Sequence, residues 1–138
     1  MPGLGYSVAY YRPEWTLSLY VYDRKANVIP DGPETPEVVM EYQRSKQELL
    51  DARQAGIYKS ADWVKDFSAP ANGKRERFVC AYYVLVARDG RSSDSFLCVS
   101  GWRNKFIKLR MTTPRNEHTT HDATVTAAEL ARYMWPGR

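Results

Sequence analysis

The chain has 138 residues, a length at which a single hydrophobic core is the usual solution. Hydrophobic residues make up 43% and charged residues 26% of it, which excludes the disordered and membrane classes. Twenty Lys and Arg against sixteen Asp and Glu give a net charge of +4, a milder bias than nucleic-acid binding usually brings. We expect one domain over residues 1–138.

The longest apolar stretch, Val79–Ala87, has nine residues, whereas a membrane-spanning helix needs about 20. We therefore expect no membrane span. The start, Met1–Gly5, has neither the basic nor the apolar region of a signal peptide. If a leader has been removed, the protein is periplasmic or exported; otherwise it is cytoplasmic.

Two alternating segments, Gly5–Tyr11 and Thr16–Asp23, predict the first two strands. The short connection 12–15 contains a proline and predicts a hairpin, so the two strands should pair antiparallel. In the second strand one face carries Leu17, Leu19 and Val21, and the other carries Ser18, Tyr20 and Tyr22.

The next element is an amphipathic helix over Pro36–Ala55. Thr35 supplies an N-cap, Pro36 occupies the first helical position, and Gly56 suits the left-handed residue after the helix. Val38, Tyr42 and Leu49 recur at helical spacing.

Four further segments have strand character. Ile57–Phe67 predicts a strand with mixed pattern, and Phe78–Arg88 predicts a long strand buried on both faces. Asn72-Gly73 and Asp89-Gly90 mark turns, and Ser95–Ser100 and Lys105–Thr112 complete a meander.

The last strand has two unlike faces. Ile107, Leu109 and Met111 point one way, and Phe106, Lys108 and Arg110 point the other. This pattern predicts that the second face meets water.

Thr126 and Glu129 form a capping box, which predicts a helix of about ten residues ending before Pro136. The fold class is therefore α+β. It consists of an antiparallel sheet of five to six strands with two helices, in the order β-β-α-(β)-β-β-β-α.

A cluster of imidazoles and carboxylates lies in the segment 117–122, which we expect to be a loop. His118, His121 and Asp122 are ligand types that suit zinc or another divalent ion. Their spacing matches no known metal motif, so a solvated polar connection competes with a metal site. A metal-dependent protein or enzyme centred on this loop is one alternative function.

A basic and aromatic surface is the second candidate. Such a mixture can stack bases and neutralise phosphates, but it is also an ordinary outer face of an amphipathic sheet. Its members are Tyr20, Tyr22, Trp102, Arg103, Lys105, Phe106, Lys108 and Arg110. Arg103, Lys105, Lys108 and Arg110 would carry a weak polyanion or nucleic-acid binder, although nucleic acid is the less favoured partner.

Cys80 and Cys98 lie on strands joined by one turn. They can form a disulfide only if the register places them opposite each other, and the turn does not fix that register. Free buried thiols are the favoured reading.

Several short patterns resemble a family of uncharacterised bacterial domains. They are Gly5–Val8 with Tyr10, Tyr20–Asp23, Asp31-Gly32 before the helix, and Ser95–Arg110. Members of that family are typically exported. The element order also resembles the PsbP and DcrB type of fold, which implies binding or accessory roles, although a fold alone does not determine function.

No nucleophile motif, phosphate-binding loop or dinucleotide-binding motif occurs, so we expect no cofactor and no enzyme activity. The leading hypothesis is a non-enzymatic accessory or binding domain that uses the aromatic and basic sheet surface, with a protein among the candidate partners.

Overall fold

The structure, a computed structural model, describes residues 4–11, 16–24, 28–70, 76–115 and 119–136. Six strands form one antiparallel sheet in the order β1-β2-β6-β5-β4-β3. The strands are β1 (Leu4–Tyr11), β2 (Thr16–Tyr22), β3 (Tyr58–Ala69), β4 (Phe78–Ala87), β5 (Ser92–Trp102) and β6 (Lys105–Pro114). The predicted α+β class is confirmed, and the bracketed strand of the predicted order is β3.

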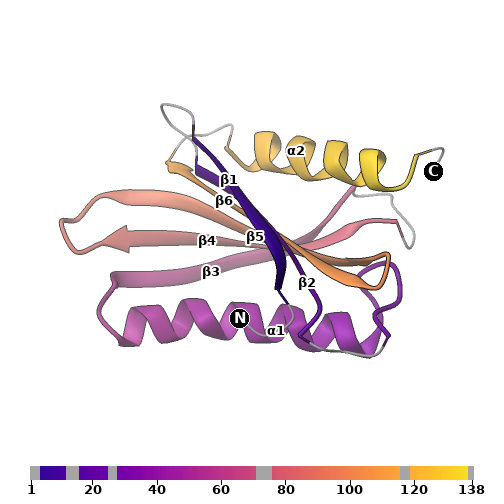
Figure 1. The fold of residues 1–138 in the computed structure, drawn as a ribbon. Helices are drawn as coiled ribbons and strands as arrows, with labels where there is room; N and C mark the ends of the chain where they lie inside the picture. The colour runs from indigo at the N-terminus through magenta and orange to yellow at the C-terminus, as the bar shows by residue number, and fades with distance from the viewer. Residues whose placement is uncertain (1–3, 12–15, 25–27, 71–75, 116–118, 137–138) are drawn as a thin grey trace.

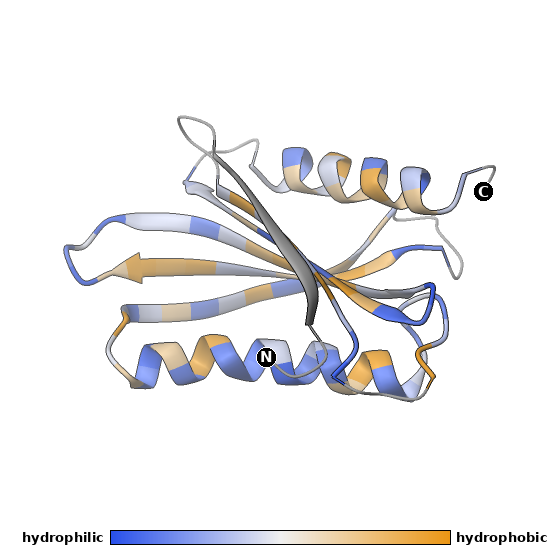
Figure 2. Ribbon diagram, in the orientation of Figure 1, coloured by the Kyte–Doolittle hydropathy of each residue, from blue (hydrophilic) through white to orange (hydrophobic). Residues whose placement is uncertain are grey.

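The helices α1 (Pro36–Gln54) and α2 (Thr119–Met134) lie on opposite faces of the sheet, below and above it in Figure 1. The alternation of side chains along each strand supplies both faces with apolar groups. On β5, for example, Leu97 and Val99 pack in the core beneath α1, and Phe96 and Cys98 pack in the core against α2. Figure 2 shows the same distribution as apolar bands along the central strands between two helices of mixed character.

The predicted start and end of α1 are confirmed, with one difference at its N-cap. Gly56 has a φ of +82°, as expected after the helix end. Thr35 has the extended backbone of an N-cap, but its side chain makes no capping hydrogen bond. The helix start therefore depends on Pro36 at the first helical position and on Glu37, whose charge complements the helix dipole.

The prediction that one face of β6 meets water is wrong. Phe106 and Lys108 are buried, and Arg110 is half-buried, because α1 covers that face of the sheet. The period-two pattern identified the shared face correctly. It could not indicate that a helix packs on the face containing two cations.

The predicted start of α2 is also wrong, because the helix already includes Thr119. Thr126 is therefore inside the helix, where its hydroxyl donates to the carbonyl of Asp122 at 2.9 Å. The buried stripe of α2 begins upstream of the capping box, with Thr119 and Ala123, and continues through Ala127, Ala128, Ala131 and Met134. This longer stripe extends the helix beyond the ten residues expected.

Cys80 and Cys98 are directly opposite each other on β4 and β5 and form a disulfide. The expectation of free thiols is thus wrong. Their Cα atoms are 4.1 Å apart, close to the spacing of about 4.5 Å for a non-hydrogen-bonded antiparallel pair. The disulfide lies in the core against α2, where both cysteines are fully buried.

The segment that precedes α1 is attached to the far end of β5. Gly32 and Gly101 exchange two backbone hydrogen bonds, of 2.9 and 3.0 Å. Asn104 adds a side-chain bond of 2.7 Å to the backbone N–H of Ile29. These contacts fix the position at which α1 begins over the sheet. Of the predicted turns, 12–15 and Asn72-Gly73 lie outside the described residues.

Candidate ligand-binding site

A cleft of about 310 Å³ lies between the C-terminal half of α1 and the sheet. The helix contributes four residues at helical spacing, so that they share one face of α1. The sheet contributes four residues, two of them cationic, and the turn after the helix contributes one. The lining residues are Ser45, Glu48, Leu49, Ala52, Ile57, Tyr58, Leu97, Lys108 and Arg110. We refer to this space as the α1 cleft.

Two polar atoms of cleft residues are buried without a hydrogen-bond partner among the described residues. They are the hydroxyl oxygen of Ser45 and the Nε of Arg110. Ser45 is only 4% exposed, so its hydroxyl is removed from solvent. The Arg110 guanidinium makes one long contact, 3.4 Å from Nη2 to the hydroxyl of Ser95. Buried polar groups normally find partners, so unpaired donors in one cleft point to a missing acceptor.

Lys108 is the second cation of the α1 cleft. It is buried, with its ammonium 5.4 Å from the centre of the Tyr20 ring and 5.9 Å from that of Tyr22. An ammonium over aromatic faces is stabilised by the ring quadrupoles. Its carboxylate contact is Glu48, at 3.5 Å, which is itself half exposed. The Lys108–Glu48 ion pair is therefore long, and its carboxylate is accessible to solvent.

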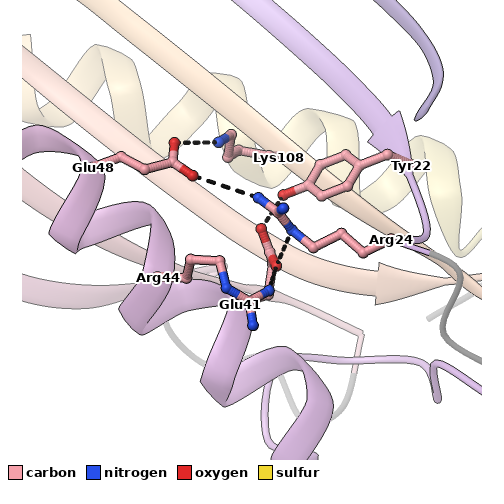
Figure 3. A network of polar contacts seen from close by, with 6 residues as sticks. All are labelled: Tyr22, Arg24, Glu41, Arg44, Glu48 and Lys108. Carbon is pink, nitrogen blue, oxygen red and sulfur yellow. Dashed lines mark hydrogen bonds and ion pairs between the residues drawn. The ribbon is translucent and has the colours of Figure 1, made fainter. Parts of the chain in front are cut away.

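Next to the cleft, a polar network anchors α1 to the sheet (Figure 3). Glu41 is fully buried and accepts hydrogen bonds from the Tyr22 hydroxyl at 2.6 Å, Arg24 Nε at 2.7 Å and Arg44 Nη1 at 2.7 Å. Burial, followed by the hydrogen bond and charge of Glu41, raises the pKa of Tyr22 well above its ordinary value. Tyr22 therefore stays a neutral donor over the accessible pH range.

Glu48 connects this network to the cleft. One of its oxygens lies 3.4 Å from Arg24 Nη2 and the other 3.5 Å from Lys108 Nζ, as the dashed lines in Figure 3 indicate. Half-exposed ion pairs at such distances contribute little to stability, about 0–1 kcal/mol. Glu48 can therefore exchange partners at small cost.

The structure divides the predicted basic and aromatic surface between two places. Tyr20, Tyr22, Phe106, Lys108 and Arg110 share the face beneath α1, where Lys108 and Arg110 line the cleft. These five residues therefore lie beneath a helix instead of on an open surface.

Three residues of that predicted surface lie elsewhere. Trp102 packs against the core beneath α2 and donates to the carbonyl of Met134 at 3.0 Å. Arg103 is exposed and lies over the Trp102 ring. Lys105 pairs with Asp23 at 2.7 Å. The four cations proposed for a polyanion surface are thus dispersed, with Lys108 buried beneath a helix.

The predicted metal-binding cluster has a different setting from the expected loop. His121 and Asp122 are exposed on the first turns of α2, and His118 lies outside the described residues. Within the described ranges, no three side chains of His, Cys, Asp or Glu converge into a metal-binding group. The metal site remains a prediction without added support.

The sequence reasoning missed Ser45, Glu48 and Glu41. Their positions on α1 follow from the predicted helix, and a polar residue on the apolar face of a helix is the available signal. Glu41 and Ser45 lie four residues apart on the buried face of α1, which also contains Val38, Tyr42 and Leu49. Buried polar positions in such a stripe indicate partners on the sheet beneath.

This arrangement of sheet and helices is a PsbP-like fold, as the element order suggested. The solution structure of cyanobacterial PsbP (CyanoP) from Synechocystis sp. PCC 6803 matches it with a TM-score of 0.55 at 15% identity, covering 94% of this chain and 74% of that chain. A crystal structure of a protein of unknown function from Pseudomonas aeruginosa matches with a TM-score of 0.45 at 12% identity, covering 90% and 78%.

A comparison with protein-family models finds no match, and a search of curated proteins finds none. At the identities of the structural matches, the likeness concerns the fold alone. In the part of the chain that the structure describes, neither helix combines the length and apolar character needed to cross a bilayer.

Proposed function

We propose that this chain is a non-enzymatic binding domain whose ligand carries a negative charge and occupies the α1 cleft. The observation that carries this proposal is the unpaired, buried Nε of Arg110 in a cleft that also contains Lys108. A guanidinium with an N–H group that lacks an acceptor is well suited to an oxyanion, because its donors lie in a fixed plane.

The local charge supports a negatively charged ligand. The cleft lining contains two cations, Lys108 and Arg110, and one carboxylate, Glu48, which pairs with Lys108 and with Arg24. Glu41, the neighbouring buried carboxylate, already accepts from Arg24 and Arg44. The charge of the cleft residues is therefore positive by one unit.

Ser45, the one serine of the cleft lining, is placed to bind a ligand and not to act as a nucleophile. A nucleophilic hydroxyl requires a hydrogen-bonded base. Ser45 Oγ has no hydrogen-bond partner among the described residues. The hydroxyl is suited to donate to a ligand that stays chemically unchanged.

A panel of small carboxylates, phosphates and sulfonates tests the proposal by two-dimensional amide NMR. We expect at least one class to shift amide signals of residues 45–52, 97, 108 and 110. Arg110→Gln should weaken that binding about tenfold or more, the effect of losing a charged hydrogen bond. Arg53→Gln is the matched control, because it removes the same charge from an exposed position on α1 that does not line the cleft.

The control variant should bind like the wild type. If no anion in the panel moves the signals of the cleft residues, or if both variants bind as the wild type does, the cleft is not a site for anions and the proposal is wrong.

A further inference from the structure

The α1 cleft is lined by apolar side chains as well as by cationic ones. The apolar ones are Leu49 and Ala52 from the helix, Ile57 from the turn after it, Tyr58 from β3 and Leu97 from β5. Leu49 and Leu97 are buried, and Ile57 is 61% exposed. A hydrocarbon group in the cleft would therefore meet three aliphatic side chains of this lining, one of which is accessible from solvent.

The charges of the cleft lining favour a ligand with one negative charge over a ligand with two. Lys108 already has Glu48 as a partner at 3.5 Å, so the unmatched charge of the cleft is one unit. The free Nε of Arg110 can combine with a terminal nitrogen of the same guanidinium to donate two parallel bonds to one carboxylate. Ser45 Oγ, buried and unpaired, can supply a further donor.

The size of the cleft agrees with a small molecule. A volume of about 310 Å³ is at the lower end of the range of about 300–1,000 Å³ found for small-molecule pockets. Such pockets combine predominantly apolar walls with a few placed polar groups that fix the orientation of the ligand. The α1 cleft combines apolar side chains with the polar groups of Ser45, Glu48, Lys108 and Arg110, in nearly equal shares.

We infer that the ligand is a small amphipathic monocarboxylate, with its carboxylate on Arg110 and its short hydrocarbon tail against Leu49, Leu97 and Ile57. This inference rests on the proposed function and adds the class of ligand. The carboxylate pairs with the free side of the guanidinium, and the tail covers the exposed apolar rim. Polar and apolar parts of one molecule thus satisfy the two unpartnered features of the same cleft.

Isothermal titration of the wild-type chain with acetate, butyrate and hexanoate tests the inference. Affinity should increase with tail length by up to about fourfold per methylene, which corresponds to about 0.8 kcal/mol. Hexan-1-ol and hexylamine, which lack the negative charge, should bind at least tenfold more weakly than hexanoate. Arg110→Gln should remove most of the hexanoate affinity.

A second variant separates the tail from the head group. Ile57→Ser changes an exposed residue, so we expect its folding to be unaffected. It should reduce the dependence on tail length and leave acetate binding as it is. This variant keeps the inference testable if Arg110→Gln, at a half-buried position in β6, fails to fold.

The outcomes distinguish the inference from the proposed function. If inorganic phosphate or acetate binds in the cleft as tightly as hexanoate, the amphipathic class is wrong and an anion site remains. If none of these anions binds, the proposed function fails with it. Equal binding of hexanoate and hexan-1-ol would also overturn the inference, because it would show that the cations play no part.

Discussion

Replacing Glu41 with Gln should destabilise the protein more than any other single change of charge on α1. Glu41 is fully buried and accepts three hydrogen bonds, of 2.6, 2.7 and 2.7 Å. Arg24 and Arg44 donate to one carboxylate oxygen, Oε1, and Tyr22 donates to the other. A glutamine amide has one oxygen for these two positions and carries no charge, so both arginines lose their ionic partner.

The expected loss follows from the exposure of the partners. Hydrogen bonds to charged groups contribute about 1.5–3 kcal/mol each, and removing one partner of a buried ion pair costs about 3–5 kcal/mol. Arg24 and Arg44 are 26% and 46% exposed, so water can solvate both after the change. We expect Glu41→Gln to lower the free energy of unfolding by about 2–3 kcal/mol, near the lower of those values.

Urea denaturation followed by far-ultraviolet circular dichroism measures this loss. Glu48→Gln is the matched control, because Glu48 is half exposed and its ion pairs are 3.4 and 3.5 Å long. It should cost no more than about 1 kcal/mol. Tyr22→Phe should cost about 1 kcal/mol and should not add fully to Glu41→Gln, since the two groups are in contact. Equal losses for Glu41→Gln and Glu48→Gln would refute the anchoring role of the network.

Three further predictions concern other parts of the fold. Reducing the Cys80–Cys98 disulfide, whose cysteines are 18 positions apart, should lower the free energy of unfolding by about 3 kcal/mol, and the mass of the unreduced protein should be about two daltons below that of the dithiol. Gly101→Ala should cost about 1–3 kcal/mol in urea denaturation, because the added Cβ would lie 2.1 Å from the Pro30 carbonyl oxygen. Burial raises the pKa of Asp66, but hydrogen bonds from other side chains outweigh it and hold this pKa below its usual value. Asp66→Asn should therefore be less stable than the wild type at pH 7. The difference should begin to shrink below about pH 4, the ordinary pKa of an unfolded aspartate, and should be lost as pH falls through the lower native pKa. A disulfide without effect on stability, a tolerated alanine, or a difference that grows in acid would contradict these predictions in turn.

The sequence was sufficient to predict which residues form most of the elements. Alternation in Thr16–Asp23 and Lys105–Thr112 identified strands and the residues that share each face. Thr35, Pro36 and Gly56 located α1 to within a residue at each end. Strand alternation and helix-end residues reflect local conformational preferences, so they can be recognised without knowledge of the tertiary contacts.

The sequence could not show what covers each face of the sheet. Phe106, Lys108 and Arg110 have the pattern of a half-exposed strand, yet Lys108 is buried beneath α1. The buried cation contacts Glu48 and the rings of Tyr20 and Tyr22, which come from distant parts of the chain. Contacts between residues so far apart in the sequence do not change the local pattern of β6, so that pattern could not predict them.

The α2 boundary and the disulfide were missed for different reasons. Thr126 and Glu129 satisfy the capping-box pattern, but Ala123 belongs to the same buried stripe, so packing extends the helix past the local signal. The pairing of Cys80 with Cys98 requires the register of β4 on β5, which the intervening turn did not determine.

The most direct test of the central claim is an amide NMR titration of the intact chain with hexanoate. A ligand site in the α1 cleft predicts saturable shifts for Ser45, Leu49, Leu97, Lys108 and Arg110, all of which line it. The signals of Trp102 and Arg103, which lie outside the cleft, should stay in place. Shifts confined to Trp102 and Arg103, or none at saturating hexanoate, would contradict a ligand site beneath α1.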